Sequence, residues 1–158
     1  MATTTPTVHA SAVLTGARAV LIRGPSGAGK SRLALALIAA AETGRLRFAR
    51  LVSDDRSRLA PHHGRLLVRP AAELAGLIEV RGLGIRRFAF EPVAVVGLVV
   101  DLAAADGERL PAEISQHVEL EGIAVARLAV ASGVDPLPLV LAALIGNDPA
   151  PAEVQFGR

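Results

Sequence analysis

The feature that most constrains this sequence is a glycine-rich segment near its start that ends in a lysine and a serine. The apolar residues 19–22 before the segment predict a strand, and the Ala- and Leu-rich residues 31–41 after it, with Gly44 just beyond, predict a helix. A strand, a glycine-rich turn and a helix in this order form the context in which such a segment holds phosphate groups. The segment reads Gly24, Pro25, Ser26, Gly27, Ala28, Gly29, Lys30 and Ser31.

Each part of this segment has a chemical use in holding a polyphosphate. The glycines let successive backbone N–H groups point inward, and the start of the helix adds a partial positive charge. The Lys30 ammonium would reach the β- and γ-phosphates, and the Ser31 hydroxyl would bind Mg²⁺. Lys30 is also the only lysine among 17 basic residues, at the place where a compact cation must fit between phosphate oxygens. The segment therefore predicts a site for ATP and Mg²⁺.

Length and composition exclude several classes of protein. The 158 residues predict one domain over residues 1–146, with the proline-containing residues 147–158 as a loose tail. A net charge of +2 and an aromatic content of 3% argue against a nucleic-acid partner. The absence of cysteine excludes disulfides and thiolate metal sites. The most apolar run, residues 93–105, is shorter than the about 20 residues of a membrane-spanning helix, so we expect a cytoplasmic protein without a membrane partner.

Short apolar runs between turn residues predict strands along most of the chain, at residues 7–14, 19–22, 50–53, 77–80, 93–100, 116–120 and 123–128. A hairpin is expected over residues 59–68, and a last helix from Pro136 or Pro138 to residue 145. The β-branched run at residues 93–100 is typical of a central strand covered on both faces. The pattern predicts a mixed α/β fold with many strands and few helices.

Two predicted strands end in carboxylates, which phosphoryl transfer needs near magnesium and near the attacking group. One end carries Asp54 and Asp55, and the other carries Asp101. Alternation along a strand would put Asp54 and Asp55 on opposite sides, so that one faces the metal and the other the acceptor hydroxyl. The sequence leaves open which aspartate faces the metal and which faces the acceptor. The alternative is that both lie in a solvated turn without a catalytic role.

The segment that begins at Glu79 is a further candidate. Gly82 and Gly84 permit a close backbone approach, and Arg86 and Arg87 could hold phosphate oxygens. A tight turn with a solvated basic end is the alternative explanation.

Among the four histidines, only His9 is a candidate for the site. It stands on the strand expected to pair with the one that leads into the glycine-rich segment, although a lone histidine more often has a structural role. His62, His63 and His117 are expected to be exposed.

Four elements in this order resemble the catalytic domain of bacterial HPr kinase/phosphorylase. They are residues 8–10, 24–31, 51–56 and 79–85, which lie within about half of the chain. That family phosphorylates a serine of the phosphocarrier protein HPr, can reverse the reaction by phosphorolysis, and so regulates the phosphotransferase system. The resemblance implies a P-loop nucleotide-binding fold related to phosphoenolpyruvate carboxykinase, HPr as the protein substrate, and a homo-oligomer, which is a hexamer in many members.

The resemblance also implies roles for individual residues. Asp55 takes the serine proton in the forward reaction and returns it in reverse, His9 is the active-site histidine, and Lys30 is the catalytic lysine. The implied magnesium ligands are Ser31 and Glu79, and Asp54 joins them as the other member of the acidic pair.

Two departures from the family are visible. The family usually carries a separate N-terminal domain, and we expect this chain to resemble instead the short, catalytic-domain-only form of alphaproteobacteria. The place of the family's Pro- and Arg-rich stretch, residues 132–139, contains no arginine, which predicts weak or absent phosphorolysis.

Two other functions remain open at this point. A small-molecule kinase would need a lid with several arginines, which Arg45, Arg47, Arg50 or the segment 56–69 could supply. A nucleotide-binding sensor without turnover would need only the glycine-rich segment.

Overall fold

The computed structural model describes residues 6–107 and 113–146. Within these ranges the α-helices are α1 (Lys30–Glu42) and α2 (Pro136–Ile145), with short 3₁₀ turns at Ala72–Leu74 and Glu113–Gln116. The strands are β1 (Thr7–Thr15), β2 (Arg18–Arg23), β3 (Arg50–Ser53), β4 (Arg56–His62), β5 (Arg65–Pro70), β6 (Leu77–Val80), β7 (Gly84–Arg87), β8 (Ala94–Leu102), β9 (His117–Leu120) and β10 (Ile123–Val130). The fold is thus mixed α/β, with strands dominating and few helices, as the sequence predicts.

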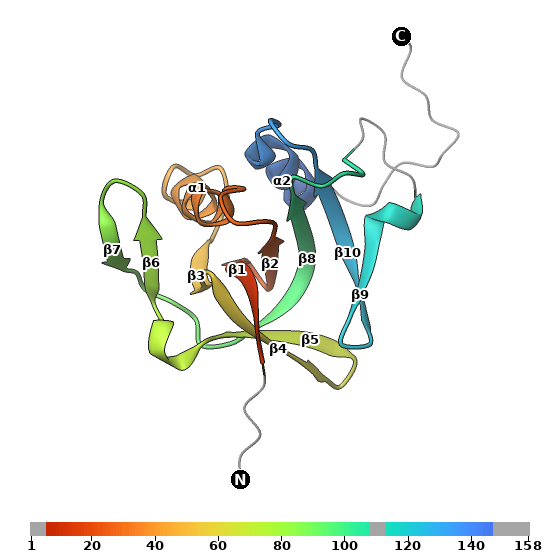
Figure 1. The fold of residues 1–158 in the computed structure, drawn as a ribbon, viewed down its shortest axis with the longest axis horizontal. Helices are drawn as coiled ribbons and strands as arrows, with labels where there is room; N and C mark the ends of the chain where they lie inside the picture. The colour runs from red at the N-terminus through yellow and green to blue at the C-terminus, as the bar shows by residue number, and fades with distance from the viewer. Residues whose placement is uncertain (1–5, 108–112, 147–158) are drawn as a thin grey trace.

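Part of the main sheet closes on itself, because two of its strands pair with different neighbours along their length. The sheet has the order β2-β1-β4-β5-β8-β10-β9, β3 is added beside β1, and β2 also pairs with β8 (Figure 1). β1, β2, β8, β5 and β4 therefore form a closed ring of hydrogen-bonded strands. The ring closes because β1 and β8 change partners along their length: β1 pairs first with β4 and then with β2, and β8 pairs first with β5 and then with β2.

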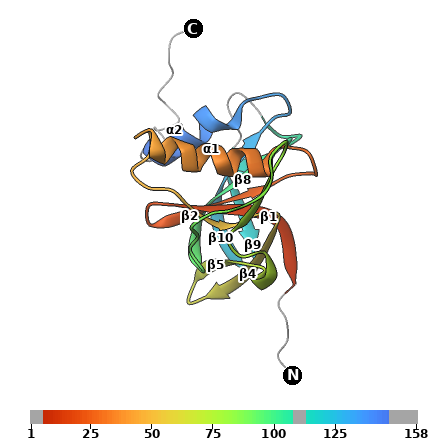
Figure 2. The same ribbon diagram turned by 90° about the vertical axis from the view of Figure 1, so that its left-hand side faces the viewer.

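The helices cover one side of this sheet, and β4 and β5 lie on the other (Figure 2). Two apolar cores result. Ala19 and Leu21 of β2 face the core inside the ring, whereas Val20 and Ile22 face α1 and α2. β8 is likewise covered on both faces, as its β-branched run predicts. β2, which leads into the glycine-rich loop, and its neighbour β8 are therefore held between two cores.

The predicted strands and both predicted helices are confirmed, with ends that differ by a few residues. The hairpin expected over residues 59–68 begins earlier, at Arg56, because β4 continues in the direction of β3 after a bend at Asp54 and Asp55, and both strands pair antiparallel with β1. β7 was not predicted as a strand. The predicted tail 147–158 lies outside the described residues. No helix in the described part of the chain combines the length and the apolar character needed to span a membrane.

β6 and β7 form a separate two-stranded hairpin beside α1 (Figures 1 and 2). Ile78 of β6 is fully buried, whereas every residue of β7 is exposed. The chain after β7 joins the edge of the main sheet, where Phe90 bridges to Leu51 of β3 and the Glu91 N–H donates to the Leu51 carbonyl at 2.8 Å. The hairpin is therefore connected to the edge of the sheet formed by β3, the strand that leads to Asp54 and Asp55.

Candidate active site

The glycine-rich segment forms a tight loop between β2 and α1. Gly27 and Gly29 have φ values of 81° and 101°, in the left-handed region that glycine adopts without strain. Gly24 lies against the end of β8, where an added Cβ would come within 3.1 Å of the Leu102 Cβ. The Ala28 N–H donates to the Pro25 carbonyl at 3.0 Å and closes the turn. The glycines are therefore required by geometry at three positions of the loop.

The start of α1 presents backbone donors to this loop. Gly29 is the N-cap of α1, and no side chain caps this helix start. The first N–H groups of a helix lack partners within the helix, so they are suited to bind an anion. The Lys30 ammonium donates to the carbonyls of Gly24 at 2.8 Å and Pro25 at 3.2 Å. The only lysine of the chain thus lies over the loop.

Asp54 connects the loop to the sheet. Its carboxylate accepts the Ser31 hydroxyl, whose oxygen lies 2.8 and 2.9 Å from the two carboxylate oxygens. It also accepts the Ser11 hydroxyl of β1 at 2.7 Å. Asp54 is 6% exposed, which is rare for a carboxylate unless it has partners. The structure brings two of the predicted metal-facing residues, Ser31 and Asp54, into direct contact.

Asp55 points away from Asp54 into solvent. Its side chain is 64% exposed, and its Oδ1 lies 3.9 Å from Nδ1 of His9. Asp55 has a φ of 65°, a left-handed value that is uncommon outside glycine and that often marks functional sites. The two acids thus have different surroundings, as expected for the acidic pair, and they lie at a bend between β3 and β4, which both continue along β1. The structure also brings together two of the predicted catalytic residues, His9 and Asp55.

Ser11 is a site residue that the sequence reasoning missed. Its hydroxyl oxygen donates to Asp54 and accepts the Asp55 N–H at 3.3 Å, so it touches both members of the acidic pair. Ser11 is fully buried between Ala10 and Ala12. The sequence signal that could have identified it is a polar residue within an apolar strand, two positions after His9.

Glu79, the further predicted metal ligand, makes no side-chain hydrogen bond with Ser31 or Asp54. Antiparallel pairing sets it opposite Ile85, which is 64% exposed, and alternation puts it on the other face from buried Ile78. Within the described ranges the side chain of Glu79 makes no hydrogen bond or ion pair, and no group of three or more His, Cys, Asp or Glu residues is arranged to hold a metal. Its role as a magnesium ligand stays a prediction.

Asp101, the acid at the other strand end, has different partners. Its carboxylate forms hydrogen bonds with two guanidinium groups, those of Arg23 and Arg127. Burial by itself raises the pKa of the Asp101 carboxyl, but hydrogen bonds and charge from the two arginines outweigh burial, so that its pKa lies below the ordinary value. The Ser31 hydroxyl is therefore held by Asp54 and not by Asp101.

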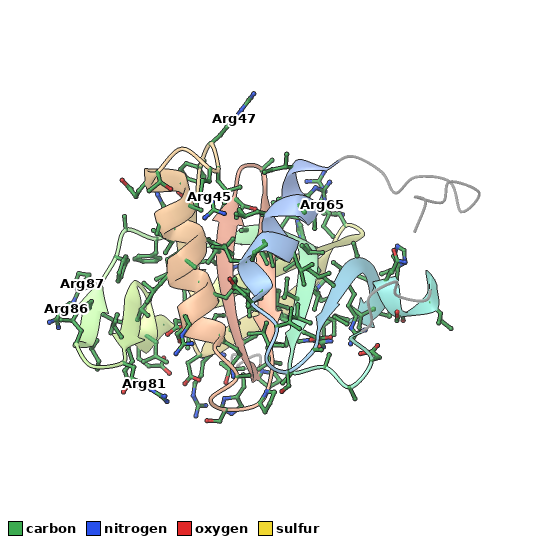
Figure 3. The ribbon with its side chains drawn as sticks, turned by 90° about the horizontal axis from the view of Figure 1, so that it is seen from above. Arg45, Arg47, Arg65, Arg81, Arg86 and Arg87 are labelled. Atoms are coloured by element: carbon green, nitrogen blue, oxygen red, sulfur yellow. The ribbon has the colours of Figure 1, made fainter. Side chains whose placement is uncertain are left out.

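The exposed arginines fall into groups with different positions relative to the loop. Arg81 lies toward the loop end of α1, and Arg86 and Arg87 lie further along the β6–β7 hairpin, whereas Arg45 and Arg47 lie at the opposite end of α1 (Figure 3). Arg50 is paired with Glu91 at 2.8 Å. Among the candidate lid arginines of a small-molecule kinase, Arg45 and Arg47 thus lie away from the loop and Arg50 is paired with Glu91.

The comparisons with known proteins agree with this geometry. The sequence profile of the family described as HPr Serine kinase C-terminal domain matches residues 1–131. The solved structure of the Hpr(Ser) kinase/phosphatase from Coxiella burnetii is similar, with a TM-score of 0.68 and 27% sequence identity, over 88% of this chain and 93% of that one. No curated protein sequence matches the chain. The chain belongs to the family of HPr serine kinase C-terminal domains and is a phosphotransferase of the HPr serine kinase type.

Proposed function

We propose that this enzyme transfers the γ-phosphoryl group of ATP, bound with Mg²⁺ at the glycine-rich loop, to a serine of HPr. The observation that carries the proposal is the division of the acidic pair, with Asp54 buried on the Ser31 hydroxyl and Asp55 exposed beside His9. A kinase needs one acid for the metal and one for the attacking hydroxyl. The pair supplies both from neighbouring positions in the chain.

The residues around Ser31 fit a magnesium ion. A serine hydroxyl and a carboxylate are oxygen donors of the kind that Mg²⁺ prefers, and Mg²⁺ usually takes one or two carboxylates together with substrate phosphates and water. When bound, the ion neutralises charge on the phosphate oxygens. Ser31 and Asp54 would hold it, and Glu79 is the further ligand that the family resemblance implies.

Asp55 would act as the base. The acceptor serine oxygen attacks the γ-phosphorus, its proton passes to an Asp55 carboxylate oxygen, and the bond to the β-phosphate oxygen breaks to release ADP. His9, 3.9 Å from Asp55, is placed to hold that carboxylate or the incoming serine. The Lys30 ammonium and the backbone N–H groups at the start of α1 stabilise the negative charge on the phosphoryl group in transit.

The exposure of Asp55 and His9 favours a protein acceptor. Their side chains are 64% and 71% exposed, so a serine on the surface of another protein can reach them without entering a pocket. A small-molecule kinase usually encloses its acceptor so that water is excluded. The open position of the base therefore supports a serine of a folded carrier over a small metabolite.

The direct test is incubation of the purified enzyme with HPr and labelled ATP, followed by mass mapping of the phosphorylated residue. We expect one phosphoserine on wild-type HPr and none on an HPr variant with that serine changed to alanine. Label that stays in ATP or appears only as free phosphate would reject HPr as the acceptor. Label on a small molecule from a metabolite mixture would favour the small-molecule kinase.

A further inference from the structure

The last residue of β2 is tied to the end of β8 immediately before the phosphate loop. Arg23 and Asp101 are partners in the parallel pairing of these strands. The Arg23 guanidinium donates through Nε to one carboxylate oxygen at 2.8 Å and through Nη2 to the other at 2.9 Å. A two-bonded arginine–carboxylate pair fixes orientation as well as distance.

A second arginine holds Asp101 from the other side. Nε of Arg127, on β10, donates to Asp101 at 2.6 Å, while its two terminal nitrogens donate to Asp106 at 2.7 and 3.0 Å. Arg127 also donates to the Ser115 carbonyl at 2.9 Å. Its hydrogen bonds with Asp106 raise the pKa of Arg127 above the ordinary value, although burial opposes this. Asp101 is thus a half-buried anion between two permanent cations, and each of its oxygens accepts a hydrogen bond from an arginine.

The contact matters for the loop because Arg23 is the residue before Gly24. Gly24 packs on Leu102, the residue after Asp101, at a distance that leaves no room for a side chain. The loop is therefore anchored at its beginning by Arg23 and Gly24 on β8, and at its end by Ser31 on Asp54. Two aspartates at two strand ends hold the two ends of one loop.

We propose that Asp101 is a positioning residue for phosphoryl transfer: acting through Arg23, it fixes the start of the phosphate loop so that the loop's backbone N–H groups meet the nucleotide phosphates. Asp101 does not touch the nucleotide in this proposal, and Arg127 acts by holding Asp101. Without the Asp101 charge, Arg23 loses its anchor and stands near a second cation, Arg127, which repels it. This inference rests on the proposed function in one respect, namely that the loop binds a nucleotide.

The test is a double-mutant cycle in which the dissociation constant for ATP–Mg²⁺, kcat, the KM for HPr and the midpoint of thermal unfolding are measured. Asp101→Asn keeps the size of the side chain and removes its charge, and Arg23→Met removes the partner. We expect Asp101→Asn to weaken nucleotide binding about tenfold and to lower kcat by about 10–100-fold, since a displacement of about 1 Å can have effects of this size. The KM for HPr should change less than twofold or so, because Asp101 is remote from the acceptor.

The cycle separates positioning from a purely structural role. If Asp101 acts through Arg23, Asp101→Asn has an effect of about twofold or less on nucleotide affinity when Arg23 is already Met. The proposal would be overturned if the loss of nucleotide affinity in the double variant equalled the product of the two single losses. An unchanged nucleotide affinity in folded Asp101→Asn would overturn it as well. Glu91→Gln is the matched control, because it breaks the Arg50–Glu91 pair of equal length and should lower the unfolding midpoint without altering nucleotide affinity.

A second variant covers the case in which Asp101→Asn does not fold. Arg23→Lys keeps the charge at a partly exposed position but loses one of the two bonds, so it should weaken nucleotide binding by about two- to fivefold. Wild-type affinity in Arg23→Lys would contradict the proposal as well. Failure of the wild-type enzyme to bind ATP–Mg²⁺ would instead reject the proposed function, so the two failures are distinguishable.

Discussion

The Ser31 hydroxyl oxygen lies 2.8 and 2.9 Å from the two carboxylate oxygens of Asp54, across the boundary between α1 and the end of β3. This contact joins the last residue of the glycine-rich loop to an acid that is 23 positions later in the chain. The carboxylate that binds the loop therefore comes from the end of β3. Asp101, on β8 beside β2, instead forms hydrogen bonds with two arginines. The predictions below follow from this arrangement.

Lys30→Ala is expected to lower the rate of phosphoryl transfer by at least about 10²–10³ and to weaken ATP binding. The substitution removes the charge that stabilises the phosphoryl group in transit. Stopped-flow or filter-binding measurements of ATP affinity, together with the transfer rate to HPr, check this. Arg45→Ala, at the far end of α1, is the control and should behave as wild type; near-normal turnover in Lys30→Ala would show that the loop is not the phosphate site.

Ser11→Ala is expected to raise the Mg²⁺ concentration needed for half-maximal transfer and to reduce the free energy of unfolding by about 1–3 kcal/mol, the cost of removing a hydrogen bond to a buried charged group. Ser57→Ala is a matched control, because Ser57 is equally buried and hydrogen-bonded to Ser53 and the Ala10 carbonyl but does not touch Asp54. Ser57→Ala should lower stability and leave the Mg²⁺ titration unchanged. Equal Mg²⁺ titrations for both variants would remove Ser11 from the site.

Glu79→Gln tests the predicted metal ligand whose side chain makes no hydrogen bond with Ser31 or Asp54 in the structure. The family resemblance predicts a higher Mg²⁺ requirement with little change in metal-free nucleotide affinity, because glutamine keeps the size but loses the charge. Glu73→Gln, a change at an exposed glutamate in the turn before β6, serves as the control. A Mg²⁺ titration of Glu79→Gln that overlays the wild-type curve would limit Glu79 to a structural role in the hairpin.

The reverse reaction is expected to be weak or absent. Phosphorolysis brings inorganic phosphate to a phosphoserine, two anions that need several positive groups to hold them together. Residues 132–139 supply no arginine, and Arg127 is already bound to Asp101 and Asp106. Arg81, Arg86 and Arg87 of the β6–β7 hairpin form no ion pair in the part of the chain that the structure describes.

This prediction is checked with serine-phosphorylated HPr and millimolar phosphate, by following the release of pyrophosphate. A rate far below the forward kinase rate of the same preparation is expected. A comparable rate would show that the arginine-containing stretch of the family is dispensable and that the argument from charge fails.

Much of the fold could be predicted because the chain signals its local structure clearly. Glycines mark the loop, residues 31–41 lack any helix breaker, and the β-branched run of β8 is typical of a strand covered on both faces. β7 could not be predicted in the same way. Its residues Gly84–Arg87 are all exposed, so no alternation of apolar and polar residues marks them, and only the pairing with β6 makes them a strand.

The site was predictable where neighbours in sequence are also neighbours in space. The loop and the acidic pair lie in short continuous segments, so motif spacing identified them. Which carboxylate serves the loop depends on the order of strands across the sheet, which spacing does not contain. Asp54 and Asp101 follow similar apolar runs, and only the tertiary structure shows that Asp54 meets Ser31 whereas Asp101 meets Arg23.

The division of work between Asp54 and Asp55 is the central claim. Its most direct test measures, for Asp54→Asn and Asp55→Asn, both ATP–Mg²⁺ affinity and the rate of phosphoryl transfer to HPr at saturating nucleotide. Asp55→Asn should keep ATP–Mg²⁺ affinity within a few-fold and lower transfer by about 10²–10⁴, as expected for a lost general base. Asp54→Asn should instead weaken Mg²⁺-dependent nucleotide binding. A severe transfer defect in Asp54→Asn at saturating Mg²⁺, combined with a mild one in Asp55→Asn, would contradict the account.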